Sequence, residues 1–77
     1  MSGDKTFVDT NILVYSHDVD AEQKHQIAQN ILLELWKNRN GVLSVQVLQE
    51  FYVTMTRKVL HPIPPNSVRN IIRDYFN

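Results

Sequence analysis

The sequence predicts an α/β fold in which two short parallel strands alternate with pairs of helices, in the order β-α-α-β-α-α. Two short segments rich in β-forming residues, at 6–8 and 41–44, are each followed by apolar residues at helical spacing. Helical segments separate the two strands, and strands connected in that way form a parallel pair joined by a right-handed crossover. The 77 residues contain no repeat, linker or low-complexity run, so we expect a single domain.

The first strand runs directly into Asp9. Phe7 and Val8 favour a buried strand, and a carboxylate cannot lie in an apolar core without a partner. We therefore expect Asp9 at the carboxyl end of the strand, where open α/β sheets present their ligands. Thr10 or Asn11 can cap the short helix that follows. The alternative is that Asp9 is itself the helix N-cap and binds nothing.

The clearest helix is expected to begin after Asp20 and to end around residues 37–41. Asp20 is a suitable N-cap, and Gln23, three residues later, completes a capping box. If the connection before this helix folds back over the strand ends, Asp18 lines the cleft there. Gly41 follows the basic residues that end the helix, as is typical of a helix C-terminus. Six apolar residues form one stripe, which predicts one buried face: Ile27, Ala28, Ile31, Leu32, Leu35 and Trp36.

The second strand, at 41–44, leads into a helix whose predicted N-cap is Ser44. Glu50 lies on this helix amid apolar residues, and a carboxylate so close to a buried stripe needs a counter-ion, a hydrogen-bond network or a metal. The alternative is that Glu50 faces the solvent or pairs with Arg57 or Lys58. Those two cations could also contact phosphates, or serve the helix dipole. The apolar stripe comprises Val45, Leu48, Tyr52, Met55 and Val59, broadened by Val47 and Phe51.

A last helix is expected after the proline-rich break at 61–65, with Asn66 or Ser67 at its start. Its acidic residue, Asp74, follows Arg73, which indicates a surface ion pair. One face of this helix carries Val68, Ile71, Ile72, Tyr75 and Phe76.

The segments FVDTNILVY (7–15) and LSVQVLQEFY (43–52) together resemble the PIN-domain family of metal-dependent ribonucleases, and in particular its VapC-like toxins. The resemblance implies a Rossmann-like three-layer fold. It also implies that Asp9 and Glu50 are catalytic residues that hold Mg²⁺ or Mn²⁺, with Asn11 and Ser44 beside the site in supporting roles. The substrate would be RNA, and the partner an antitoxin protein.

Family members carry further acidic residues in a later strand–helix region, and we find no counterpart for them here. We therefore expect residues 1–77 to form an incomplete, truncated PIN-like domain with weak or no ribonuclease activity. In the alternative, the chain is a non-catalytic module derived from a PIN domain that oligomerises or binds an antitoxin. A third possibility is a scaffold without metal chemistry. A two-stranded sheet leaves unpaired edges, so we expect a homodimer or larger homo-oligomer.

The composition excludes several classes of protein. Eight Lys and Arg balance eight Asp and Glu, so the chain lacks the electrostatic footprint of a strong nucleic-acid binder. The sequence contains no cysteine, which excludes disulfides and Cys-type zinc sites, and its three histidines lack zinc-ligand spacing. No apolar stretch approaches the roughly 20 residues of a membrane span, and the start lacks the features of a signal peptide. We therefore expect a cytoplasmic protein.

Overall fold

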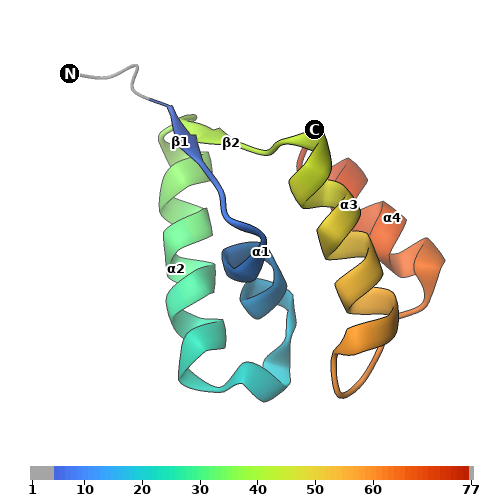
Figure 1. Ribbon diagram of the computed structural model, residues 1–77. Helices are drawn as coiled ribbons and strands as arrows, with labels where there is room; N and C mark the ends of the chain where they lie inside the picture. The colour runs from blue at the N-terminus through green and yellow to red at the C-terminus, as the bar shows by residue number, and fades with distance from the viewer. Residues whose placement is uncertain (1–4, 77) are drawn as a thin grey trace.

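The computed structural model describes residues 5–76 and shows a small α/β fold (Figure 1). The order of its main elements confirms the predicted β-α-α-β-α-α arrangement, with two additional short turns of helix. The elements are β1 (Thr6–Phe7), α1 (Thr10–His17), the 3₁₀ turn η1 (Val19–Ala21), α2 (Gln23–Lys37), β2 (Gly41–Val42), α3 (Val45–Val53), the π-helical segment η2 (Thr54–Lys58) and α4 (Pro65–Asp74).

The two strands pair in parallel, as predicted, with Thr6 opposite Gly41 and Phe7 opposite Val42. A hydrogen bond of 2.9 Å from the Val8 N–H to the Val42 carbonyl continues the pairing beyond the strand ends. Figure 1 shows the strands at one end of the molecule, where α1 lies between α2 on one side and α3 on the other. The strand pairing therefore sets the starting points of α1 and α3 side by side.

The core lies where α1 meets the other helices. Its largest fully buried side chains are Leu13 of α1, Phe51 of α3, Met55 of η2 and Val68 of α4. Val8 is also buried, but Phe7 is 74% exposed, so the prediction that both residues lie in a buried strand is wrong for Phe7. Successive side chains of a strand point to opposite faces, and the described helices cover the face to which Val8 points.

The start of α2 differs from the prediction. Glu22 is the N-cap, with a φ of 56° and no capping hydrogen bond from its side chain, so the capping box at Asp20 and Gln23 is wrong. The Asp20 carboxylate instead contacts His61 Nδ1 at 2.7 Å. Asp18 caps η1, since its carboxylate accepts a 3.1 Å hydrogen bond from the Asp20 N–H. The Asp20 carboxylate thus contacts His61 and the Asp18 carboxylate caps η1, so neither caps α2.

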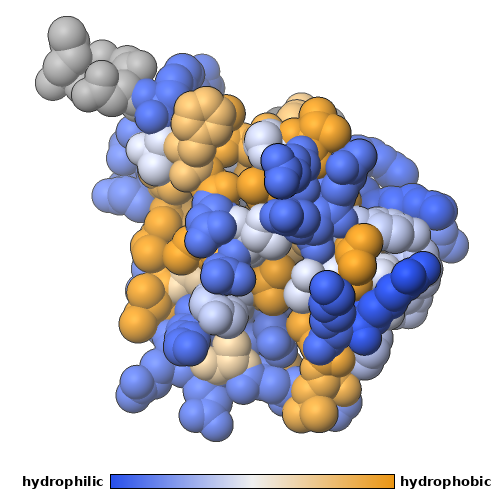
Figure 2. Space-filling model, in the orientation of Figure 1, coloured by the Kyte–Doolittle hydropathy of each residue, from blue (hydrophilic) through white to orange (hydrophobic). Residues whose placement is uncertain are grey.

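The predicted apolar stripes are broader than the faces that the fold buries. On α2, Ala28 and Leu32 are buried and Leu35 and Trp36 partly so, whereas Ile27 and Ile31 are exposed. Exposed apolar residues also occur at the ends of the later helices, where Val45 and Phe76 were predicted to be buried. Figure 2 shows hydrophobic side chains reaching the surface over α2 and over the strands.

The predicted helix starts near Ser44 and after the proline-rich break agree closely with the structure. The Ser44 hydroxyl accepts a 3.1 Å hydrogen bond from the Val47 N–H, which confirms it as the N-cap of α3. The last helix begins at Pro65, one residue before Asn66, because proline suits the first turn, where the N–H has no partner within the helix. In the described part of the chain, Asp74 forms no ion pair with Arg73.

None of the helices among residues 5–76 is long and apolar enough to cross a membrane.

Helix α2 ends in a Schellman motif whose left-handed residue is an arginine. Arg39 has a φ of 58°. The Asn40 N–H bonds to the Leu35 carbonyl at 3.1 Å and the Arg39 N–H to the Trp36 carbonyl at 3.2 Å. Gly41, predicted to end the helix, lies in β2, where an added Cβ would come within 2.8 Å of the Trp36 ring. The absence of a side chain at Gly41 therefore allows α2 to pack closely against β2.

An aromatic cluster ties the end of α4 to the other helices. His17 Nε2 lies 2.6 Å from the Tyr75 hydroxyl, and the His17 ring lies 5.5 Å from that of Phe51. Trp36 Nε1 donates a 3.3 Å hydrogen bond to the Tyr75 carbonyl. Burial, together with the nearby charge of His25, lowers the pKa of His17, and burial raises the pKa of Tyr75. At neutral pH the cluster thus holds an uncharged imidazole.

We predict that Arg39→Gly raises the free energy of unfolding. A left-handed conformation costs an L-residue about 1–2 kcal/mol, and the entropy of the more flexible unfolded glycine offsets about 0.5–1 kcal/mol of this gain. The net gain, up to about 1 kcal/mol, is measurable by urea denaturation. Lys37→Gly is the control, because Lys37 is the last residue of α2 and still has a helical backbone, so glycine there lowers stability. A less stable Arg39→Gly protein would contradict the assigned helix end.

We also predict that His17 and His61 contribute to stability with opposite pH dependence. The folded protein holds the His17 proton more weakly than the unfolded chain does, so the stability from His17 falls as the pH drops below about 6.5. The hydrogen bond and charge of Asp20 raise the pKa of His61, so its contribution is present in acid and is lost as the pH rises.

The measurement is urea denaturation of the wild type, His17→Asn and His61→Asn proteins between pH 5 and pH 8. The cost of His17→Asn should shrink on acidification, whereas that of His61→Asn should grow. If the cost of His17→Asn instead grew in acid, His17 would be protonated in the folded protein and the assigned burial would be wrong.

Candidate functional site

A hollow of about 480 Å³ lies between the start of α1 and the exposed side of α3 and η2. It brings Asp9 and Glu50, the two predicted metal ligands, to one place from opposite halves of the sequence. We call it the acidic hollow. Its lining residues are Asp9, Thr10, Asn11, Gln49, Glu50, Val53, Thr54 and Lys58.

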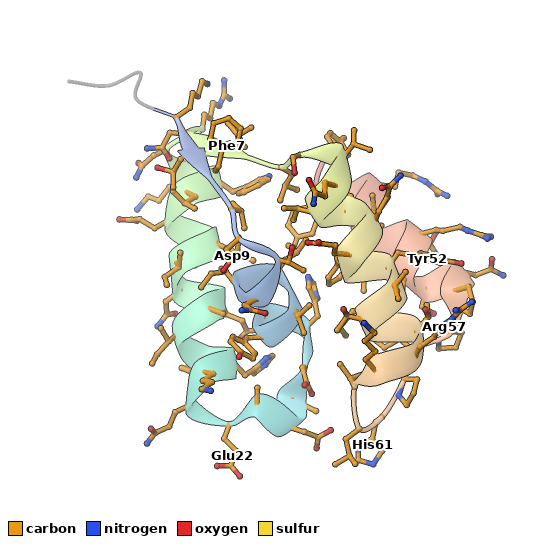
Figure 3. The ribbon with its side chains drawn as sticks, in the orientation of Figure 1. Phe7, Asp9, Glu22, Tyr52, Arg57 and His61 are labelled. Atoms are coloured by element: carbon orange, nitrogen blue, oxygen red, sulfur yellow. The ribbon has the colours of Figure 1, made fainter. Side chains whose placement is uncertain are left out.

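Asp9 occupies the N-cap position of α1 but does not cap the helix with its side chain. Its backbone is extended, with φ −72° and ψ 147°, and its carbonyl accepts hydrogen bonds from the N–H groups of Ile12 and Leu13. Its carboxylate makes no capping hydrogen bond and is exposed. The prediction that Thr10 or Asn11 is the cap is therefore wrong. Figure 3 shows Asp9 at the beginning of α1.

Glu50 is held in place by Thr10. The Thr10 hydroxyl donates a 2.6 Å hydrogen bond to Glu50 Oε1, and the two residues are 40 positions apart in the sequence. Glu50 is exposed, although the next residue, Phe51, is fully buried. In the part of the chain described, no ion pair joins Glu50 to Arg57 or Lys58. Glu50 is therefore solvent-exposed, as in the alternative, and the Thr10 hydroxyl of α1 hydrogen-bonds its carboxylate.

The two predicted supporting residues, Asn11 and Ser44, differ in whether they line the acidic hollow. Asn11 lines the acidic hollow, so its side-chain amide can reach a ligand there. Ser44 does not line it, and its hydroxyl is used as the N-cap of α3. Asp18, which was expected to line the cleft if the connection folded back, caps η1 instead. The structure thus leaves Asp9, Glu50 and Asn11 as candidate ligand-binding residues.

The oxygen atoms of the hollow suit a hard cation. Asp9 and Glu50 supply carboxylates, Thr10 a hydroxyl and Asn11 an amide carbonyl, and Mg²⁺ prefers such ligands. Residues 5–76 contain no group of three or more His, Cys, Asp or Glu side chains that could hold a metal ion. Mg²⁺ is often bound by one or two carboxylates together with water and substrate phosphate. The residues therefore fit a weak site that a phosphate ligand completes.

Sequence reasoning assigned neither Thr10 nor Lys58 to the site. Thr10 was considered as a helix cap, and its contact with Glu50 depends on the packing of α1 on α3. Lys58 was considered as a partner of Glu50, as a phosphate contact or as a cation at a helix end, and it lines the hollow together with Glu50 and Thr54. Residues four apart are neighbours on a helix surface, so the steps from Glu50 to Thr54 and from Thr54 to Lys58 are a signal that the sequence does contain.

Comparisons with protein-family models, curated proteins and solved structures found no significant match for this chain. The likeness of FVDTNILVY and LSVQVLQEFY to PIN domains thus stays a prediction. Inferences about function depend on the geometry of the acidic hollow.

Proposed function

We propose that this chain is a PIN-domain-like, Mg²⁺- or Mn²⁺-dependent ribonuclease of the toxin–antitoxin type, with weak or no activity. The observation that carries the proposal is the meeting of Asp9 and Glu50 in one hollow, with Glu50 oriented by Thr10. A site with two carboxylates binds a divalent cation more weakly than one with three or four. We therefore expect weak ribonuclease activity, because the site binds its cation weakly.

In the proposed reaction, RNA is cleaved by hydrolysis of a phosphodiester bond. A bound divalent cation would lower the pKa of the attacking water and stabilise the charge on the leaving oxygen. Asp9 and Glu50 would hold the cation, and the Thr10 hydroxyl orients Glu50. Asn11 lies beside them and can donate a hydrogen bond from its amide to a substrate oxygen.

The remaining parts of the proposal concern fold, partners and location. The parallel strand pair and the helix order suit the front part of a Rossmann-like, three-layer PIN fold. We further propose an antitoxin protein as partner and the cytoplasm as location. The absence of cysteine from the sequence agrees with a reducing compartment.

The second candidate function is a non-catalytic module that oligomerises or binds an antitoxin. Exposed apolar side chains favour it. Val45 is 71% exposed and Leu33 is 70% exposed, although both are large hydrophobic residues. A further hollow of about 470 Å³ between α3 and α4 is lined mainly by apolar residues. These residues are Val45, Leu48, Gln49, Tyr52, Val53 and Ile72.

The first test is calorimetric titration with Mn²⁺, combined with a ribonuclease assay. We expect weak binding of one Mn²⁺, and a loss of affinity of about tenfold or more in Asp9→Asn and Glu50→Gln. Thr10→Val should also lower the affinity, because Glu50 loses the hydroxyl that orients it. Glu34→Gln is the matched control, since Glu34 is an exposed carboxylate outside the hollow. Unchanged affinity in Asp9→Asn would contradict the proposal.

The second test is the oligomeric state, measured by size-exclusion chromatography with light scattering. We expect a homodimer or larger assembly, because apolar side chains at the surface gain from burial between copies. Val45→Glu should shift the protein towards the monomer if the α3–α4 hollow contributes to that contact. A monodisperse monomer at high concentration would contradict the expected homo-oligomer.

A further inference from the structure

The helix that carries Glu50 continues into a π-helical segment, η2, whose last residue is Lys58. The Val59 N–H bonds to the Thr54 carbonyl at 3.2 Å, which closes the wide turn at the end of this segment. Most π-helices are single turns inserted in α-helices, and they occur frequently at functional sites. The position of Lys58 therefore depends on an unusual backbone feature.

The wide turn brings Lys58 into line with Glu50. Two turns of an α-helix take about 7.2 residues, so residues eight apart do not fall on one line along its surface. A π turn takes more residues than an α turn, and the eight steps from Glu50 to Lys58 then come closer to two full turns. Glu50, Thr54 and Lys58 accordingly line the same hollow.

Lys58 lies at the acidic hollow without contacting its carboxylates. Among residues 5–76, it forms no ion pair and donates no side-chain hydrogen bond. Lys58, Asp9 and Glu50 line a space of about 480 Å³, which can admit a phosphate group.

The charge of the hollow depends on a bound cation. Asp9, Glu50 and Lys58 give it a formal charge of −1 at neutral pH, which repels a phosphate. A divalent cation on the two carboxylates would change that charge to +1. The phosphate could then lie between the cation and the ammonium, so that each neutralises part of its charge.

We propose that Lys58 binds a backbone phosphate of single-stranded RNA opposite Asp9 and Glu50, and does so only when the carboxylates hold a divalent cation. This inference rests on the proposed metal-dependent function and adds the residue that binds the polymer. Lysine is well suited to such a contact, since its ammonium acts as a compact point charge.

Arg57 provides a matched control on the same segment. It is adjacent in the sequence and equally exposed, but it does not line the hollow. Figure 3 shows Arg57 on the side of η2 that faces away from α1 and Asp9. Arg57→Gln and Lys58→Gln each remove one exposed positive charge from η2, so the net charge of the protein changes equally. A difference between them reports the position of the charge.

The test is fluorescence anisotropy with a labelled, cleavage-resistant 2′-O-methyl RNA oligonucleotide, in saturating Mn²⁺ and over a range of salt concentrations. Lys58→Gln should weaken binding by about three- to tenfold and lower the slope of log affinity against log salt by about 0.7, the value for one phosphate contact on a single strand. Lys58→Arg should retain the slope, and Arg57→Gln should not change it. In EDTA, the wild type and Lys58→Gln should bind equally weakly.

Calorimetric titration of the same proteins with Mn²⁺ separates the two proposals. If the wild type binds Mn²⁺ through Asp9 and Glu50 but Lys58→Gln and Arg57→Gln bind RNA alike, the inference about Lys58 is overturned and the proposed function stands. If the wild type binds no Mn²⁺, the proposed function fails and the inference fails with it. Circular dichroism checks that the variants fold, as expected for exposed positions.

Discussion

The parallel pairing of β1 with β2 is the constraint on which the site depends. Thr6 lies opposite Gly41 and Phe7 opposite Val42, and Asp9 and Ser44 each follow two residues after the end of their strand. These two residues are the N-caps of α1 and α3, so both helices begin at the same end of the strand pair. Glu50 then follows one and a half turns into α3, where the Thr10 hydroxyl reaches it at 2.6 Å. The pairing of two residues in each strand thus helps to bring Asp9 and Glu50 to the same hollow.

The fold separates neighbouring side chains on α3 into different environments. Phe51 is fully buried against α1, whereas Glu50, one position earlier, remains exposed at the acidic hollow. An exposed carboxylate avoids the desolvation penalty that a buried one would incur. It also leaves the site open to water and to a polymer, which a cation with few protein ligands requires. The same openness makes binding weak, because few protein groups are fixed around the ion.

The sequence allowed prediction of the features that depend on neighbouring residues: the order of elements, the parallel pair and the N-cap at Ser44. The resemblance to PIN domains also led to the prediction that Asp9 and Glu50 lie at one site. Predictions failed where a distant partner decides the outcome. Asp20 lies in η1 and contacts His61, whereas Glu22 takes the N-cap position of α2. The π-helical segment Thr54–Lys58 was not predicted, because the apolar spacing of its residues is compatible with a regular α-helix.

The most direct measurement is Mn²⁺-induced line broadening in a ¹H–¹⁵N NMR spectrum of the protein, since a paramagnetic ion broadens the signals of the nearest amides first. If Asp9 and Glu50 share one ion, the amides of residues 9–11 and 49–51 should broaden together at the lowest Mn²⁺ concentrations. Broadening that began at only one of these segments, or at the acidic residues of 18–22, would contradict a shared site and with it the account of function.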